Sequence, residues 1–266
     1  MAGGAREPGR GVVSKALSLL EAFEGHPRAL TQTELVKITG LPQPTVHRLA
    51  GELVEWGALH RDSQGRYQVG MRLWELSQNA GRQLRETARP FVQDLHGLTR
   101  QMSQIAVREG AEVLYIDRVY GSERVPRATR VGGRLPIHVT AVGRAILAFE
   151  PQWVQDSICD GPLERLTPMT VTSPSALRRE LDLVREQGWA STYEQVRTGS
   201  CSIAVPVWAR GAEVGAGLGL VLPSSAAGSM QRYLPTLRGI AEALEKATSH
   251  VPPATIRRTG AIPPPR

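Results

Sequence analysis

The chain has 266 residues, 41% of them hydrophobic and 21% charged, which is enough for two domains of ordinary size with packed cores. No stretch approaches the roughly 18 continuous apolar residues that span a bilayer, and the first ten residues lack the apolar centre of a secretory signal. We therefore expect a cytoplasmic protein without membrane contact. The net charge of +7 invites a nucleic-acid partner, but residues 1–80 hold nine Lys and Arg against eight Asp and Glu, a net charge of +1. The positions of individual hydrogen-bond donors, and not the overall charge, must therefore identify any part of the chain that binds nucleic acid.

Two helices are expected at the start of the chain. Ser14 is placed to cap the first helix, which should end near Gly25. Its apolar residues recur with helical spacing and form one face: Ala16, Leu17, Leu19, Leu20 and Phe23. Thr31 and Glu34 have capping-box spacing at the start of a second, short helix, and Gly40 is suited to end it.

A third helix is expected from about Gln43 to Trp56, after the turn at residues 40–42. Two helices joined by about four residues that include a glycine have the layout of a helix-turn-helix. Residues 58–61 and 67–70 then suggest two short strands around a polar turn, which makes a wing. A long helical pattern follows from residue 71 to about 101, with a break expected near Pro90 and the domain boundary near residue 80.

The second domain mixes strands and helices. Strand patterns cover residues 103–107, 113–119, 201–208 and 214–222, and helical patterns cover 141–149, 175–187 and 230–249. Ser173 or Ser175 is placed to cap the second of these helices. Hairpin-connected strands flanked by helices predict an α+β domain with an antiparallel sheet.

The third helix carries polar side chains that suit a DNA major groove. Gln43 and Arg48 are able to form bidentate bonds with base edges, Thr45 can contact a phosphate or a thymine methyl, and His47 lies on the same exposed turns. Pro44 stands in the first turn, where the helix N-terminus favours a phosphate. Two further cations, Arg66 at the wing tip and Lys15 in the first helix, are candidates for backbone contacts. The alternative is that these side chains form only the solvated face of a small helical domain.

Six segments, in order, resemble motifs of the IclR family of bacterial transcription regulators. Three lie in the first domain, at residues 14–17, 41–49 and 65–70, and three in the second, at residues 131–145, 185–190 and 202–207. The resemblance covers roughly residues 12–250. It implies a winged helix-turn-helix DNA-binding domain at 12–70, a linker helix at 71–88 and an effector-binding domain at 89–250. The composition of the Gly/Arg-rich leader at 1–11 and of the proline-rich tail at 251–266 predicts that both are disordered.

In this family the second domain is related in fold to GAF and PAS sensor domains and encloses a small effector. Matched motif by motif, the resemblance implies a pocket lined by Leu135, Ala141, Val142, Thr192, Glu194, Ser200, Ser202, Gly219 and Val221. Some family members have an acid at the position of Thr192, a cysteine at Ser202 and serines at Gly219 and Val221, and this chain departs at all four. The effectors of those family members therefore cannot be assigned to this chain, although small organic or aromatic acids are the common class of effector in the family.

Several arginines lie between the first strands and the motif at residues 131–145. They could draw an organic acid towards the pocket, or they could form a solvated face or a subunit contact: Arg118, Arg124, Arg127, Arg130 and Arg134.

No catalytic or metal-binding pattern stands out. The six histidines lack paired ligand spacing, and the two cysteines, Cys159 and Cys201, provide neither a disulfide framework nor a structural zinc site. The glycines at 215–219 lie in a strand pattern without the following helix of a nucleotide-binding loop, and residues 199–202 do not have GxSxG spacing. We expect no catalytic residues, no metal and no cofactor.

The sequence thus predicts a DNA-binding transcription regulator, a repressor, whose affinity for a roughly palindromic double-stranded operator changes when a small effector binds the second domain. A homodimer or a pair of dimers would match such an operator. The alternative is a metabolic enzyme that acts on a small organic acid and carries an accessory DNA-binding domain.

Overall fold

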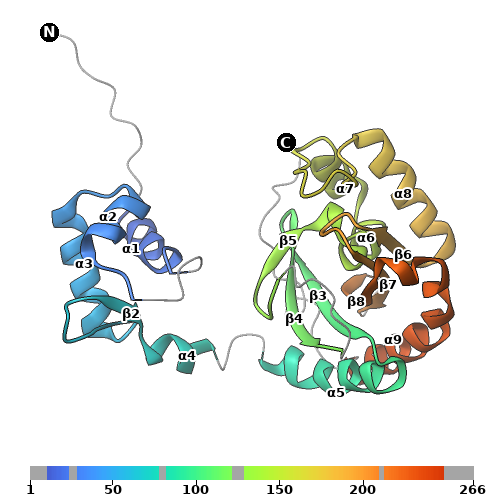
Figure 1. The fold of residues 1–266 in the computed structure, drawn as a ribbon, viewed down its shortest axis with the longest axis horizontal. Helices are drawn as coiled ribbons and strands as arrows, with labels where there is room; N and C mark the ends of the chain where they lie inside the picture. Colours follow the sequence, from blue (N-terminus) through green and yellow to red (C-terminus); the bar gives the residue numbers. More distant parts are fainter. Residues whose placement is uncertain (1–10, 24–28, 78–81, 122–128, 210–212, 249–266) are drawn as a thin grey trace, which may run out of the picture. The chain divides into compact units, whose positions relative to one another are not determined.

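The computed structural model describes residues 11–23, 29–77, 82–121, 129–209 and 213–248. The chain divides into two compact units, residues 1–80 and 81–266 (Figure 1). The leader at 1–10 and the tail at 249–266, including most of the predicted disordered segments, lie outside the described residues. None of the helices within the described ranges is long and apolar enough to cross a membrane.

The first unit is a winged helix-turn-helix. Its helices are α1 (Val12–Glu21), α2 (Gln32–Thr39), α3 (Gln43–Trp56) and α4 (Met71–Ser77), and its strands are β1 (Leu59–Arg61) and β2 (Tyr67–Val69). The strands pair antiparallel, and Leu30 adds a bridge to Tyr67, with backbone hydrogen bonds in both directions at 2.9 and 2.7 Å. A small core of apolar side chains from α1, α2, α3 and the strands holds the unit together.

Local signals for α2 and α3 are confirmed. The side chains of Thr31 and Glu34 cap each other's backbone N–H groups at the start of α2, as a capping box does. Gly40 ends α2 with φ of 69°, a left-handed conformation that glycine adopts without steric cost. The turn that follows is therefore short, and α3 begins at Gln43 with Val46 and Leu49 buried beneath it.

The second unit is a six-stranded antiparallel sheet with helices on both faces. The strands are β3 (Met102–Glu109), β4 (Glu112–Val119), β5 (Arg134–Pro136), β6 (Ala190–Tyr193), β7 (Ser200–Trp208) and β8 (Val214–Pro223), in the spatial order β5-β4-β3-β8-β7-β6. Helices α5 (Arg82–Thr99) and α9 (Leu234–Thr248) cover one face. The other face is covered by η1 (Ile137–Val139), α6 (Ala141–Leu147), α7 (Gln152–Cys159) and α8 (Pro174–Gln187).

Side-chain size differs between the two faces of the sheet. Ile203 and Val205 point towards α5 and α9, whereas Ala204 between them points towards α6, as strand alternation requires. Gly217 lies on the α6 face too, and a Cβ there would be 2.6 Å from the Val142 carbonyl oxygen. Small residues on this face therefore allow α6 to pack close to the sheet. The glycines of β8 serve packing within a strand, as the sequence indicated.

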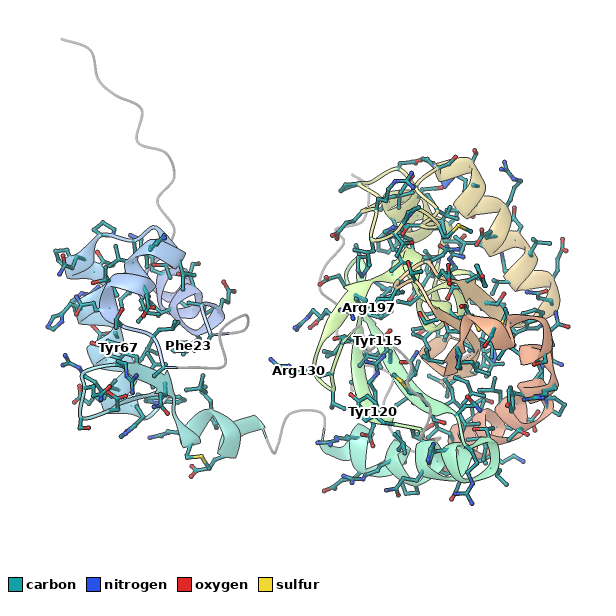
Figure 2. The ribbon with its side chains drawn as sticks, viewed as in Figure 1. Phe23, Tyr67, Tyr115, Tyr120, Arg130 and Arg197 are labelled. Atoms are coloured by element: carbon teal, nitrogen blue, oxygen red, sulfur yellow. The ribbon has the colours of Figure 1, made fainter. Side chains whose placement is uncertain are left out.

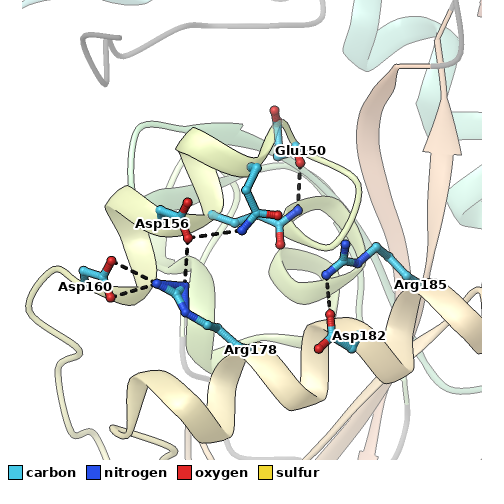
Figure 3. Close-up of polar contacts among 8 residues, drawn as sticks. Glu150, Asp156, Asp160, Arg178, Asp182 and Arg185 are labelled. Atoms are coloured by element: carbon cyan, nitrogen blue, oxygen red, sulfur yellow. Dashed lines mark hydrogen bonds and ion pairs between the residues drawn. The ribbon is translucent and has the colours of Figure 1, made fainter. Parts of the chain in front are cut away.

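Salt bridges join the helices of this face. The guanidinium of Arg178 in α8 contacts Asp156 at 3.1 Å and Asp160 at 2.9 Å, which ties α8 to α7 and the residue after it (Figure 3). Because all three side chains are substantially exposed, these pairs are screened by water and add little stability.

Three helix expectations are wrong. Ser14 lies inside α1, which begins at Val12 with Gly11 as N-cap. Pro90 does not break α5, because Pro90 is exposed and water can satisfy the carbonyl that loses its partner. Residues 230–233 belong to the 3-10 segment η2 (Ser224–Tyr233), and α9 begins only at Leu234, where Pro235 stands in the first turn. The short elements β5, β6 and α7 were not expected from the sequence.

Candidate nucleic-acid interface and ligand cavity

The exposed side chains at the start of α3 form the candidate nucleic-acid interface. Gln43, Pro44, His47 and Arg48 are exposed, and Thr45 is half-buried. Because residues three to four apart share a helix face, the first two turns present these groups together. Val46 and Leu49 anchor the opposite side in the core. This is the arrangement by which the second helix of a helix-turn-helix enters a major groove.

In the described part of the first unit, the side chains of this face have only weak internal partners. The Nη1 of Arg48 lies 2.7 Å from the Oε1 of Glu52, one turn along α3, with both side chains more than half exposed. The Nδ1 of His47 lies 3.3 Å from the Oε1 of Gln32 in α2. An exposed ion pair at i,i+4 spacing, such as Arg48 with Glu52, is worth about 0.3–0.5 kcal/mol, so a phosphate or a base edge can replace it.

The wing holds Arg66 in a defined position. Its Nε donates to the Oδ2 of Asp62 and its backbone N–H donates to the Oδ1, both at 2.9 Å. These bonds, led by the one from the Arg66 backbone, lower the pKa of Asp62 and keep it charged. Both the side chain and the backbone N–H of Arg66 therefore have a hydrogen-bond acceptor within the wing. Arg61 of β1, which the sequence reasoning did not single out, is exposed, donates to the Gly65 carbonyl and lies over the Tyr67 ring.

Lys15 lies on α1, half-buried, apart from α3 in sequence. Helix α4 continues from the wing, and Arg72 in it packs over the Trp56 ring at 4.5 Å while donating to the Trp56 carbonyl at 3.2 Å. The start of α4 is thereby attached to the end of α3.

A cavity of about 430 Å³, partly open to solvent, lies in the second unit. Its described wall is built from six strands and two loops: Met102, Gln104, Tyr115, Arg118, Leu135, Thr140, Thr192, Gln195, Val196, Ser200, Cys201, Ser202 and Val221. Figure 2 labels Tyr115 together with Tyr120, Arg130 and Arg197, which lie along the same side of the unit in this view.

The residues that the family motifs assign to the pocket fall into two groups. Leu135, Thr192, Ser200, Ser202 and Val221 line the cavity. The others are not part of its wall. Ala141, Val142 and Gly219 form the contact between α6 and the sheet, where a Cβ on Gly219 would be 3.0 Å from Val142. Glu194 has a left-handed backbone, with φ of 49°, and its carboxylate accepts a hydrogen bond from the Gly199 N–H at 2.8 Å.

Hydroxyl groups dominate one side of the cavity. The side-chain oxygens of Thr192 and Ser202, which are opposite each other on β6 and β7, lie 2.6 Å apart. The hydroxyl of Ser200 donates to the Arg197 carbonyl at 2.8 Å, and the Cys201 thiol donates to the Pro223 carbonyl. Burial raises the pKa of the Cys201 thiol, so it stays protonated at neutral pH. This side of the wall is polar and uncharged.

A buried arginine positions a loop that forms part of the cavity wall. Arg144 of α6 is 1% exposed, and its guanidinium contacts Glu180 of α8, the side chain of Gln195 and the carbonyl of His138, the last at 2.6 Å. Gln195 lines the cavity, and its carbonyl accepts from the Thr170 hydroxyl at 2.8 Å. Arg144 therefore joins the cavity wall to two helices.

Among the arginines of this group that the structure describes, only Arg118 lines the cavity. Arg130 is exposed, Arg134 pairs with Glu109 at 2.6 Å, and Arg124 and Arg127 lie outside the described residues. Within the ranges that the structure describes, no three His, Cys, Asp or Glu side chains come together in a way that could hold a metal ion.

The chain is similar to known regulators along most of its length. The family model described as the C-terminal part of the bacterial transcriptional regulator IclR matches residues 78–246, and the model of the IclR helix-turn-helix domain matches residues 12–63. The transcriptional regulators KipR of Bacillus subtilis and XynR of Escherichia coli are each 31% identical, over 78% of this chain and 84% of their own. These relatives are regulators and not enzymes.

Solved structures of IclR regulators have a similar fold along most of this chain. An IclR homologue from Microbacterium hydrocarbonoxydans, crystallised as a complex with 4-hydroxybenzoate, superposes with a TM-score of 0.82 at 32% identity, over 89% of this chain and 98% of that one. The IclR structure from Thermotoga maritima has a TM-score of 0.72 at 25% identity, over 88% of this chain and 97% of that one.

Proposed function

Because the chain belongs to the IclR family of bacterial transcription regulators, we propose that it represses transcription by binding a roughly palindromic operator as a homodimer or a pair of dimers. The residues proposed to contact DNA are Lys15, Gln43, Pro44, Thr45, His47, Arg48 and Arg66. The observation that carries this proposal is the exposed polar face at the start of α3, on a helix whose other side is anchored in the core.

A small organic acid is the proposed effector, and its site is the 430 Å³ cavity. The described wall of the cavity combines apolar side chains, neutral hydroxyls and one arginine, a set that suits a compact molecule with an anionic group. The Microbacterium homologue, which was crystallised with 4-hydroxybenzoate, makes an aromatic acid a reasonable first candidate. An effector changes operator affinity only to the extent that it binds one arrangement of the protein more tightly than another.

The proposal is tested by titrating the full-length protein, at fixed salt, against its own upstream intergenic DNA and an unrelated fragment, followed by fluorescence anisotropy. We expect binding to the intergenic DNA that the unrelated competitor does not displace, and a shift of that affinity when an effector is added. Equal, weak affinity for both fragments, repeated with DNA selected from the whole genome, would contradict the regulator proposal.

A further inference from the structure

Arg118 is a buried cation in the wall of the cavity, and an irregularity in β4 puts it there. In the pairing of β3 with β4, Ala106 is opposite Tyr115 and Ile105 is opposite Asp117, so Ile116 is an extra residue. Tyr115 lies on the cavity side of the sheet. Without the bulge, alternation would place Asp117 on that side too; with it, Arg118 takes that place, opposite Gln104.

Asp117, on the other face, does not neutralise Arg118. Its carboxylate lies 3.9 Å from the guanidinium of Arg85 in α5, and only the backbone N–H of Arg118 reaches it, at 3.0 Å. The bulge thus separates two adjacent opposite charges onto opposite faces of the sheet.

The contacts of the Arg118 side chain are neutral throughout the described part of the chain. Its Nε lies 3.1 Å from the Oε1 of Gln104, its Nη2 contacts the same oxygen, and its Nη1 donates to the Thr129 carbonyl. The Tyr120 side chain adds a hydrogen bond, and the Tyr115 ring lies under the guanidinium at 4.0 Å. No described carboxylate lies within 4 Å of it, although the residue is only 8% exposed.

Such a site is poorly compensated without a ligand. Burial lowers the pKa of Arg118, but an arginine remains charged at neutral pH. A buried charge without a countercharge is unfavourable, and an anion that enters the cavity would relieve this. A guanidinium carries five N–H donors in a planar fork that fits a carboxylate.

The rest of the wall, as far as the structure describes it, provides no cation for a second negative charge. Thr192, Ser200 and Ser202 provide hydroxyl groups, and Met102, Leu135 and Val221 provide apolar contact. Of the described residues that line the cavity, Arg118 is the one with a charged side chain. We propose that Arg118 binds the carboxylate of the effector and that the cavity selects small monocarboxylates over neutral analogues and over dicarboxylates. This inference rests on the proposed function only in taking the cavity as the effector site.

Isothermal titration calorimetry of the full-length protein tests this inference with matched probes. The probes are 4-hydroxybenzoate and 4-hydroxybenzamide, pyruvate and pyruvamide, and benzene-1,4-dicarboxylate as the dianion. We expect at least one monocarboxylate to bind, with its amide and the dicarboxylate each about 10- to 100-fold weaker, as the loss of a hydrogen-bonded charge contact predicts. In Arg118→Gln the preference for carboxylate over amide should disappear, whereas Arg118→Lys, which keeps the charge, should retain part of it.

Arg134→Gln is the matched control, because Arg134 is a neighbouring arginine on β5 that pairs with Glu109 outside the cavity wall. It should bind the probes as the original protein does. Circular dichroism and thermal unfolding of each variant without ligand establish that it is folded. The inference is overturned if no monocarboxylate binds at millimolar concentration, if amide and acid bind equally, or if Arg118→Gln keeps the preference.

Operator binding in the same preparations separates the two proposals. A protein that binds its operator and responds to a neutral amide would refute the role of Arg118 and leave the regulator proposal standing. A protein that binds the carboxylate through Arg118 but binds no operator would refute the regulator proposal alone.

Discussion

At the scale of single residues, Arg48 is the side chain on α3 whose removal should affect DNA most and folding least. It is exposed and its only described partner is Glu52. We expect Arg48→Ala to weaken operator binding by about 1–3 kcal/mol, roughly 5- to 150-fold, by fluorescence anisotropy. Arg185→Ala is the control, since Arg185 forms a comparable exposed pair with Asp182 on α8 in the other unit (Figure 3). Equal affinities of the two variants would contradict the assignment of α3 as the recognition helix.

Arg144 illustrates the opposite case, a charged residue whose role is structural. Arg144→Met leaves the carboxylate of Glu180, the amide of Gln195 and the His138 carbonyl without their shared donor. We expect a loss of about 3 kcal/mol in the free energy of unfolding, measured by urea denaturation. Arg178→Met removes an arginine from exposed ion pairs with Asp156 and Asp160, so its effect should stay within about 1 kcal/mol. Similar losses of unfolding free energy in both variants would show that the burial of an arginine does not determine how much its removal destabilises the protein.

At the scale of elements, the packing of α6 depends on the absence of one side chain. A Cβ on Gly143 would overlap the Ile137 carbonyl oxygen and lie 2.6 Å from the Thr140 hydroxyl, which caps the helix. Gly143→Ala should therefore destabilise the second unit by about 1–3 kcal/mol. Gly239→Ala, in the exposed face of α9 with open space around the new methyl group, should instead stabilise it by about 0.5–1 kcal/mol. Thermal unfolding of both variants checks this, and a stabilising Gly143→Ala would contradict the close packing.

At the scale of the whole molecule, most of the positive charge lies outside the first unit. Residues 1–80 carry a net charge of +1 out of +7, whereas Arg257, Arg258 and Arg266 contribute three positive charges near the end of the chain. If the side chains of α3 and the wing determine DNA binding, changing these three arginines to glutamine should leave operator affinity within about twofold at each salt concentration. A large loss of affinity, with a shallower dependence on salt, would show that the tail contacts phosphates.

Much of the local structure could be predicted from the sequence, because the signals lie within a few residues of each other. Thr31 with Glu34 marked the start of α2, Gly40 marked its end, and apolar spacing gave the bounds of α3. The strand patterns at residues 201–208 and 214–222, on either side of a turn, indicated the β7–β8 hairpin. Short elements such as β6 and α7 escaped prediction, since their stability comes from neighbours distant in sequence.

The ligand cavity, in contrast, was decided by tertiary structure. Regular strand alternation along β4 would place Asp117 on the same side of the sheet as Tyr115, facing the cavity. Pairing with β3 introduces the bulge at Ile116. Because of the bulge, Arg118 faces the cavity in place of Asp117, and the cavity wall carries a positive charge where it would otherwise carry a negative one. The winged helix thus follows from local patterns, because its caps, turns and apolar faces act over single helical turns. The charge of the cavity follows from the register between strands, which depends on the packing of the whole sheet.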